Sequence, residues 1–365
     1  MSAAASLLKC QRTIADRHVK PDNLTGLVQS LTTLVPVCIL WYLVSLSSQL
    51  TNWVAVGAMA AMSFFLLRVF VLMHECGHGS LFLTPRLNRA FGFVFGVVAG
   101  MPQFVWSQHH QFHHSTNGDW SKYRGPLNIV PVEEYDAMSA LQKRRYRFFR
   151  NIWLAPVGGL LYLIINPRLT WIRCSARLVC HILARKIADP KLTIGAAARE
   201  FQAPYCASLQ EYRHMLWNNV ALLGLWALMA WALGPVLFFA CYLSSLSLAG
   251  GVAIVLFTVQ HNFEHSYASE NDGWDRNAAA IEGTSFLILP AWLNWFTANI
   301  GYHHVHHLCA RIPNYRLVQC HNEQRHLFAG VRRITLFQIP RALTYILWDT
   351  KARRLISVDE YLKAA

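Results

Sequence analysis

The sequence predicts an all-α membrane protein in which two transmembrane helical hairpins carry a cytosolic helical cap. The chain of 365 residues is 54% hydrophobic, two long segments lack any charged residue, and most histidines gather in four short windows. A mean hydropathy of +0.26 is unusual for a water-soluble domain. Since no internal repeat and no low-complexity linker divides the chain, we expect a single integrated domain over residues 1–365.

The hairpins are predicted from residues 23–67 and 214–263, which contain no Asp, Glu, Lys or Arg. A helix needs about 20 apolar residues to cross a bilayer, so each segment is long enough for two crossings. The turns are expected at 47–53 and 232–236, and the cap at 74–215 and 260–365. The predicted spans are residues 31–50, 53–73, 216–233 and 236–259.

Three further apolar runs, at 90–106, 152–166 and 283–296, are each short, broken by Gly or Pro, or both. We predict that they lie in the membrane interface or dip back, rather than cross. The four histidine windows can meet on one side of the membrane only if none of these runs crosses it.

The orientation follows from the basic residues, which are retained preferentially in cytoplasmic segments. All 33 Lys and Arg lie outside the two predicted turns, so both termini and the cap are expected in the cytoplasm. Arg68 alone falls inside a predicted span, near the cytoplasmic end, where its guanidinium could snorkel to the interface. The net charge of +14 fits this topology and attraction to anionic lipid, and the basic run at 142–150 could also dock an acidic redox partner. A nucleic-acid partner is not expected, because no nucleic-acid module is visible.

Twelve of the 17 histidines fall in four windows: HECGH (74–78), HHQFHH (109–114), HNFEH (261–265) and HHVHH (303–307). Histidines three or four residues apart share a helical face, so each window aims its imidazoles one way. His109 and His304 point off these faces, and the five histidines outside the windows are expected to be structural. The convergent candidates are His74, His78, His110, His113, His114, His261, His265, His303, His306 and His307.

Ten imidazoles are too many for one metal ion, because zinc is satisfied by four ligands and a catalytic zinc by three plus water. The count therefore predicts two ions. A ligand set of imidazoles without thiolates suits iron, zinc or copper and does not choose among them.

The HECGH window also matches the HExxH motif of zinc hydrolases, in which Glu75 would activate a water. An intramembrane metalloprotease commonly adds an acidic ligand from an apolar Asp-Gly segment, whereas the only Asp-Gly here lies in the polar NDGWD stretch. The protease reading also leaves eight histidines unexplained. We therefore expect Glu75 to orient an imidazole, with Asp119 and Glu264 as candidates for the same role. A metal transporter is disfavoured, because transporters place their ligands near the bilayer midplane.

Three boxes, HECGHGSLF, HHQFHH and GYHHVHHL, together with VQHNFEHSY and the following ARIPNYRL, resemble those of the membrane fatty acid desaturases. The bacterial acyl-lipid type is the most similar, and the resemblance runs from about residue 35 to 320. It implies four transmembrane helices and a cytosolic cap that holds two irons by histidines alone. Nine of the ten candidates match the family's ligands by position; at His261 the animal stearoyl-CoA enzymes have an asparagine instead.

The resemblance implies oxygen-dependent formation of a cis double bond in a fatty acyl chain, with O2 as co-substrate and two external electrons. A related di-iron acyl hydroxylase or acetylenase shares the boxes and stays an alternative. No haem-binding HPGG segment is present, so a separate ferredoxin or cytochrome-type donor with its reductase is expected. The substrate would be carried by a membrane lipid or another acyl carrier, and the protein would be a multi-pass protein of the bacterial inner membrane. Candidate residues for an acyl tunnel are Trp106, Phe112, Trp292, Trp295 and Phe296.

Overall fold

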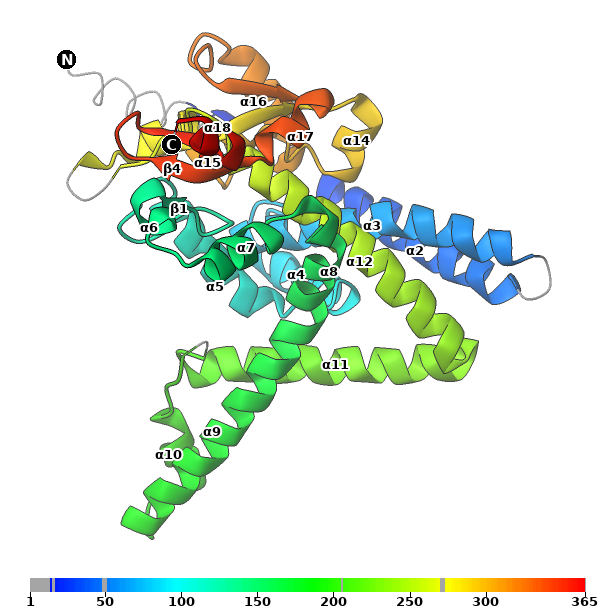
Figure 1. The fold of residues 1–365 in the computed structure, drawn as a ribbon. Helices are drawn as coiled ribbons and strands as arrows, with labels where there is room; N and C mark the ends of the chain where they lie inside the picture. Colours follow the sequence, from blue (N-terminus) through cyan, green and yellow to red (C-terminus); the bar gives the residue numbers. More distant parts are fainter. Residues whose placement is uncertain (1–13, 15–16, 48–50, 205, 270–272, 365) are drawn as a thin grey trace.

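A computed structural model describes residues 14, 17–47, 51–204, 206–269 and 273–364, and most of them are helical. Helices α2 (Asn23–Leu46) and α3 (Asn52–His78) form one hairpin, and α11 (Leu209–Leu233) and α12 (Pro235–His261) form the other. In Figure 1 the first hairpin and α12 extend from the cap toward the right. Gly234 has a φ of 81°, a left-handed value that glycine adopts without strain, and it joins α11 to α12.

These four helices overlap the four predicted spans, and each of them extends past the predicted cytoplasmic end. Polar side chains cap their starts: the side chains of Asp22, Thr51 and Ser208 accept hydrogen bonds from N–H groups of the first helical turn. Residues 48–50 of the first predicted turn lie outside the described residues. As a result of these extensions, His74, His78 and His261 still belong to helices.

The run at 152–166 is not a short separate element. It opens a continuous helical stretch, Ile152–Ala188, of 37 residues, which includes α8 (Ala155–Leu160) and α9 (Asn166–Ala188). A π-helical turn at Leu161–Ile165 precedes Pro167 and accommodates the missing proline N–H, so the helix continues. Among the described residues five helices are therefore long and apolar enough to cross a membrane, and the predicted count of four is not confirmed.

The other two short runs do not form long straight helices either. Helices α4 (Pro85–Val98) and α5 (Gln103–Thr116) meet at an angle of 101°, so the run at 90–106 bends back sharply. Gly100, with a φ of 75°, lies in the break between these helices. The run at 283–296 folds as strand β2 (Ser285–Ile288) and helix α14 (Ala291–Phe296), neither of which is long enough to cross.

The cap is not purely helical, so the all-α prediction is wrong in this detail. Strand β4 (Tyr345–Asp349) pairs with antiparallel β5 (Arg354–Ser357) and parallel β1 (Val130–Pro131), and β2 pairs with parallel β3 (Arg332–Thr335). Aromatic and β-branched residues dominate β4, and Asp349 accepts hydrogen bonds from two N–H groups in the turn that follows. The remaining cap helices include α7 (Ala140–Phe148), α10 (Ile194–Arg199), α13 (Arg276–Ile281), α15 (His303–Leu308), α16 (Asn314–Glu323) and α18 (Val358–Ala364).

Helix α12 is the centre of the packing and lies against both α3 and α8. Glycines allow the closest approach: a Cβ added at Gly159 of α8 would lie 2.4 Å from the carbonyl carbon of Gly250 in α12. A Cβ at Gly251 would lie 2.9 Å from Cα of Pro156. The backbones of α8 and α12 therefore touch where neither helix has a side chain.

The prediction that the Arg68 guanidinium reaches the membrane interface is wrong. Its side chain is buried, donates from Nε to Oγ1 of Thr33 at 3.0 Å, and donates from Nη1 to the carbonyl oxygen of Trp295. The guanidinium also lies 4.0 Å from the centre of the Trp295 ring. Arg68 thus connects α3 to α2 and α14.

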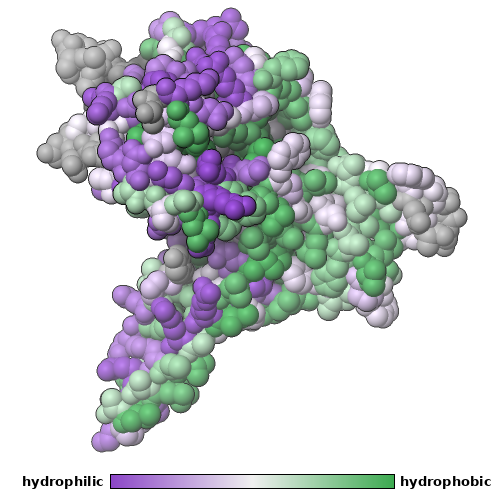
Figure 2. Space-filling model, viewed as in Figure 1, coloured by the Kyte–Doolittle hydropathy of each residue, from purple (hydrophilic) through white to green (hydrophobic). Residues whose placement is uncertain are grey.

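Figure 2 shows that the surface over the hairpins is largely apolar, whereas the cap above it is largely hydrophilic.

Candidate metal centre

The structure brings nine of the ten predicted histidines into two clusters. We call the first the five-histidine cluster (His74, His78, His110, His114 and His306) and the second the four-histidine cluster (His113, His261, His303 and His307). Within each cluster the candidate ligand nitrogens all lie within 4.8 Å of one another. The two clusters are adjacent, because the rings of His114 and His307 stack with their centres 4.1 Å apart.

Four helices supply these side chains. His74 and His78 occupy the end of α3, the α5 histidines its last two turns, and His261 is the last residue of α12. Short helix α15 supplies the other three. The windows are divided between the clusters, contrary to the prediction that each aims its imidazoles one way: on α5, His110 and His114 join the first cluster, whereas His113 belongs to the second. The carboxyl-terminal ends of α3, α5 and α12 thus meet at the site, and their negative partial charges favour bound cations.

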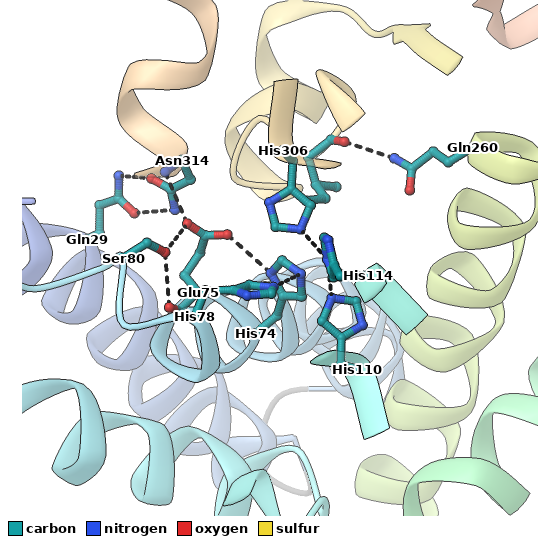
Figure 3. Close-up of polar contacts among 11 residues, drawn as sticks. Gln29, His74, Glu75, His78, Ser80, His110, His114, Gln260, His306 and Asn314 are labelled. Carbon is teal, nitrogen blue, oxygen red and sulfur yellow. Dashed lines mark hydrogen bonds and ion pairs between the residues drawn. The ribbon is translucent and has the colours of Figure 1, made fainter. Parts of the chain in front are cut away.

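The distances between ring nitrogens fit ligands of a common ion (Figure 3). Nε2 of His114 lies 3.0 Å from Nε2 of His110 and 3.1 Å from Nε2 of His306, and the Nε2 atoms of His74 and His78 are 3.2 Å apart. In the second cluster the Nε2 atoms of His261 and His303 are 2.9 Å apart. Metal–imidazole bonds of about 2.0–2.1 Å place neighbouring ligand nitrogens about 3 Å apart, so the residues fit metal ions here.

The protonation of these imidazoles also suits metal binding. Burial lowers the pKa of His303, His306 and His307 well below its ordinary value, so these rings are neutral at neutral pH. Several ring nitrogens of the two clusters are buried without a hydrogen-bond partner among the described residues. They include both nitrogens of His113 and Nε2 of His307. Burying such polar atoms unpaired is unfavourable, whereas a metal ion would satisfy them.

Glu75 orients an imidazole, as predicted. Its carboxylate is fully buried, with Oε1 3.1 Å from Nδ1 of His74 and Oε2 accepting from Oγ of Ser80 at 2.9 Å and from the backbone N–H of Asn314 at 3.1 Å. Both carboxylate oxygens are engaged, so Glu75 is not placed as the general base of a zinc hydrolase. The other two predicted acids contact no cluster imidazole among the described residues: Asp119 binds Ser121 and Lys122, and Glu264 binds Tyr345 and Arg354.

The structure places His261, and not His265, in a cluster, although His265 matches the family's ligands by position. His261 lies in the four-histidine cluster, with Nδ1 3.3 Å from the carbonyl oxygen of Gly283, which fixes Nε2 as the nitrogen facing the cluster. The side chain of His265 is 72% exposed and lies outside both clusters. The i, i+4 argument fails here because α12 ends at His261, so the two histidines do not share a helix.

Some supporting groups were not predicted. Of the two histidines predicted to point off the ligand faces, and so to lie behind the ligands or at the surface, His109 is exposed and His304 is fully buried, with Nε2 2.8 Å from Nδ1 of His321. The carbonyl of Gly283 and the N–H of Asn314 are backbone atoms, which have no signature in a sequence. Ser80 lies within the first box, HECGHGSLF, and its hydroxyl is the one supporting group that the sequence could have indicated.

Of the predicted tunnel aromatics, Trp106 contacts the centre directly. Its ring stacks on His110 at 4.6 Å and 12°, and its Nε1 donates to the hydroxyl of Tyr162. Phe112 is exposed, and Trp292, Trp295 and Phe296 pack against Phe64 or Phe65 of α3. A pocket also opens beside the four-histidine cluster and is lined by residues that include Trp120, Arg124, His261, Asn262, Tyr267 and Trp348.

Most of this chain is similar in sequence to known proteins. Residues 51–338 match the family described as Fatty acid desaturase, which is well over half of the chain. A fatty acid desaturase of Bacillus subtilis is 31% identical over 339 residues, covering 93% of this chain and 87% of that protein. An sn-1 oleoyl-lipid 12-desaturase of Picosynechococcus is 26% identical, covering 68% of this chain and 62% of that protein. An omega-3 fatty acid desaturase of Sesamum indicum chloroplasts is 24% identical, over 78% of this chain and 58% of its own length. The chain therefore belongs to the fatty acid desaturase family of oxidoreductases.

Proposed function

We propose that this chain introduces a cis double bond into a fatty acyl chain, using O2 and two external electrons at a centre of two iron ions. The observation that carries the proposal is the pair of adjacent clusters made of nine imidazoles, together with membership of the family. The five-histidine cluster would hold one iron and the four-histidine cluster the other. His265 is not included, because its side chain is turned to solvent.

Iron is favoured over zinc by the reaction. Removing hydrogens from unactivated methylenes with O2 needs a metal that changes oxidation state, which zinc does not do. Bound iron would supply the activation of O2. The chain itself supplies neutral nitrogen ligands, a buried setting that excludes water, and the hydrogen bonds from His74 to Glu75 and from His261 to Gly283 that set the ring orientations.

The acyl chain of a membrane lipid is the proposed substrate. Helices α3 and α12 run from the apolar surface of the hairpins to the two clusters, so a chain that leaves the bilayer along them would reach the metals (Figure 2). Trp106 lies against His110 and would contact the chain near the metal; the wider tunnel assignment stays a prediction. The Picosynechococcus relative is an oleoyl-lipid desaturase by name, which supports a lipid over other acyl carriers as the substrate.

A ferredoxin or a cytochrome-type protein, reduced by its own reductase, is the proposed electron donor. Such donors are commonly acidic, and helix α7 presents Arg144, Arg145 and Arg147 at the surface of the cap. Opposite charges of this kind steer association rather than add much affinity.

We also propose four spans with a cytoplasmic cap in a bacterial inner membrane. His114 and His261 supply adjacent clusters, so the chain between them must cross the membrane an even number of times. Three candidate helices lie in this interval, and at most two of them can cross. Helix α9 carries Arg168, Arg173, Arg177, Arg185 and Lys186, which makes the stretch Ile152–Ala188 the one that does not. Because four helices from both halves of the chain build one centre, a single domain over 1–365 is supported.

Fatty acid profiling tests the proposed reaction. Lipids from a bacterial host that expresses the chain would be compared by gas chromatography and mass spectrometry with those from His306→Ala and His181→Ala variants, with double-bond positions located by derivatisation. We expect a new unsaturated species with the intact chain and with His181→Ala, and none with His306→Ala. A hydroxylated or acetylenic product would keep the centre and change the reaction. An unchanged profile, with iron bound and a working donor present, would contradict the proposal.

A further inference from the structure

Asn314, the first residue of α16, joins three separate parts of the chain beside the five-histidine cluster (Figure 3). Its backbone N–H donates to Oε2 of Glu75 at 3.1 Å. Its side-chain amide exchanges two hydrogen bonds with the amide of Gln29 in α2, at 2.9 and 3.0 Å. Its carbonyl oxygen accepts from Nδ2 of Asn299 at 3.2 Å. Asn314 is only 1% exposed, so these contacts satisfy its polar groups and hold it in place.

The contacts of Glu75 determine where the proton of His74 lies. Oε2 of Glu75 receives the N–H of Asn314 and the hydroxyl of Ser80, and Oε1 faces Nδ1 of His74. Oε2 of Glu75 already accepts these two hydrogen bonds, so Oε1 is the oxygen that receives a hydrogen from Nδ1 of His74 when this histidine binds a metal through Nε2. Nε2 of His74 is then free of a proton and turns its lone pair toward the cluster. The amino-terminal end of α16, a helix of 10 residues, favours the negative charge on Glu75.

We propose that Asn314, held by Gln29, is a positioning residue of the metal centre, because its N–H fixes the carboxylate of Glu75 and thereby the metal-binding tautomer of His74. The proposal concerns the same centre as the proposed function, but it depends only on metal binding and not on the substrate. It also connects α2, which contributes no ligand, to the ligand shell through one pair of amides.

Because the Asn314 N–H can only donate, we expect the Glu75→Gln variant to lose metal binding at His74. The hydroxyl of Ser80 can donate or accept, but the N–H of Asn314 can only donate. The glutamine would therefore turn its oxygen toward Asn314 and its NH2 toward Nδ1 of His74. Nδ1 would then have to accept, the proton would move to Nε2, and His74 could no longer bind the metal.

The direct test compares Asn314→Pro with Asn314→Ala. Both variants lose the amide pair with Gln29, but only proline also lacks the N–H. Proline is well tolerated at the first position of a helix, and the preceding Pro313, with φ −60° and ψ 147°, has a backbone conformation compatible with a following proline. The measurements are the metal affinity of the purified protein and the visible absorption spectrum of its Co(II)-substituted form, which reports the ligands directly.

We expect Asn314→Pro to bind metal about 10- to 100-fold more weakly than Asn314→Ala, with an altered Co(II) spectrum. Equal affinities and equal spectra in the two variants would overturn the proposal. If the proline variant does not fold, Glu75→Gln decides alone: weaker binding with an altered spectrum supports the proposal, and unchanged binding overturns it. A wild-type protein that binds metal normally but forms no unsaturated product would refute the proposed function and leave this inference standing.

Discussion

A histidine binds a metal ion only through a nitrogen that carries no proton, so the partner of its other nitrogen matters as much as the residue itself. Glu75 provides that partner for His74, and the carbonyl of Gly283 provides it for His261. Each contact leaves Nε2 facing its cluster. Single residues outside the ligand set therefore decide which histidines can serve as ligands.

The pair His261 and His265 gives a direct residue-scale prediction. His261→Ala removes a ligand and should bring the four-histidine cluster to three imidazoles, so bound iron should fall by about half and product should disappear. His265→Ala should leave both unchanged, because its side chain is exposed. Metal analysis and lipid profiling of the two variants measure this. A loss of iron in His265→Ala with none in His261→Ala would show that the family pattern, not the present geometry, identifies the ligand.

The sequence predicted the clustered histidines wherever a window lies within one helix. Spacings of three and four residues identified the clustered histidines of α3, α5 and α15. They also placed His109 off the face that these histidines share. The prediction failed at His265 because α12 ends at His261, with Asn262 as its cap, and nothing in HNFEH marks that end. The spacing could not divide nine histidines between two clusters either, since that depends on how four helices meet.

At the scale of elements, helix α15 carries four buried histidines, and this makes the metal-free protein sensitive to acid. Burial holds the pKa of His303, His304, His306 and His307 well below the ordinary value of about 6.5. Below that pH the unfolded chain takes up protons that the folded chain does not. The free energy of unfolding should therefore fall by up to about 1.4 kcal/mol per histidine per pH unit, and should be flat above it.

Thermal unfolding of the metal-free protein in detergent, from about pH 8 down to about pH 5, measures this effect. The unfolding temperature should decline steeply below about pH 6.5. Metal-loaded protein is the control and should resist acid to a lower pH, since bound metal competes with protons for the same nitrogens. A metal-free protein whose unfolding temperature does not change over this range would contradict the assignment of neutral, buried imidazoles.

The contact between α8 and α12 gives a second prediction at this scale. Gly159→Ala places a methyl group 2.4 Å from the backbone of Gly250, so the helices must separate. We expect a destabilisation of about 1–3 kcal/mol. Gly224→Ala in α11 is the matched control, because a Cβ there meets nothing within 4 Å; it should stabilise the helix by up to about 1 kcal/mol. Thermal unfolding of both variants should show shifts of opposite sign, and equal shifts would contradict the packing described.

Composition predicted the four long helices well, because uncharged segments of that length leave few alternatives in a membrane protein. It did not predict the continuation of 152–166 into α9, because the apolar run stops just before the basic residues that begin at Arg168. Charge ends a span but does not end a helix. The β4–β5 hairpin is not predicted, because its two strands, YILWD and RLIS, are only five and four residues long.

For the whole molecule, the adjacency of the two clusters supports the proposed number of crossings. An impermeant maleimide applied to either side of the membrane tests the proposed topology with single cysteines in a cysteine-free background. Ile187→Cys, 82% exposed near the end of α9, should react only from the cytoplasm. Val236→Cys, 83% exposed at the turn between α11 and α12, should react only from the outside. Reaction of Ile187→Cys only from the outside would mean that the stretch Ile152–Ala188 crosses, and reaction of Val236→Cys only from the cytoplasm would contradict the second hairpin.

The central claim is that nine histidines hold two metal ions side by side, and the number of iron atoms per chain tests it most directly. Elemental analysis of the purified, iron-loaded protein should give two irons per chain. His110→Ala should lower this value, whereas His109→Ala, which changes the exposed neighbour on the same helix, should keep both irons. One iron per chain in the wild-type protein, or equal iron in the His110→Ala and His109→Ala variants, would contradict the account.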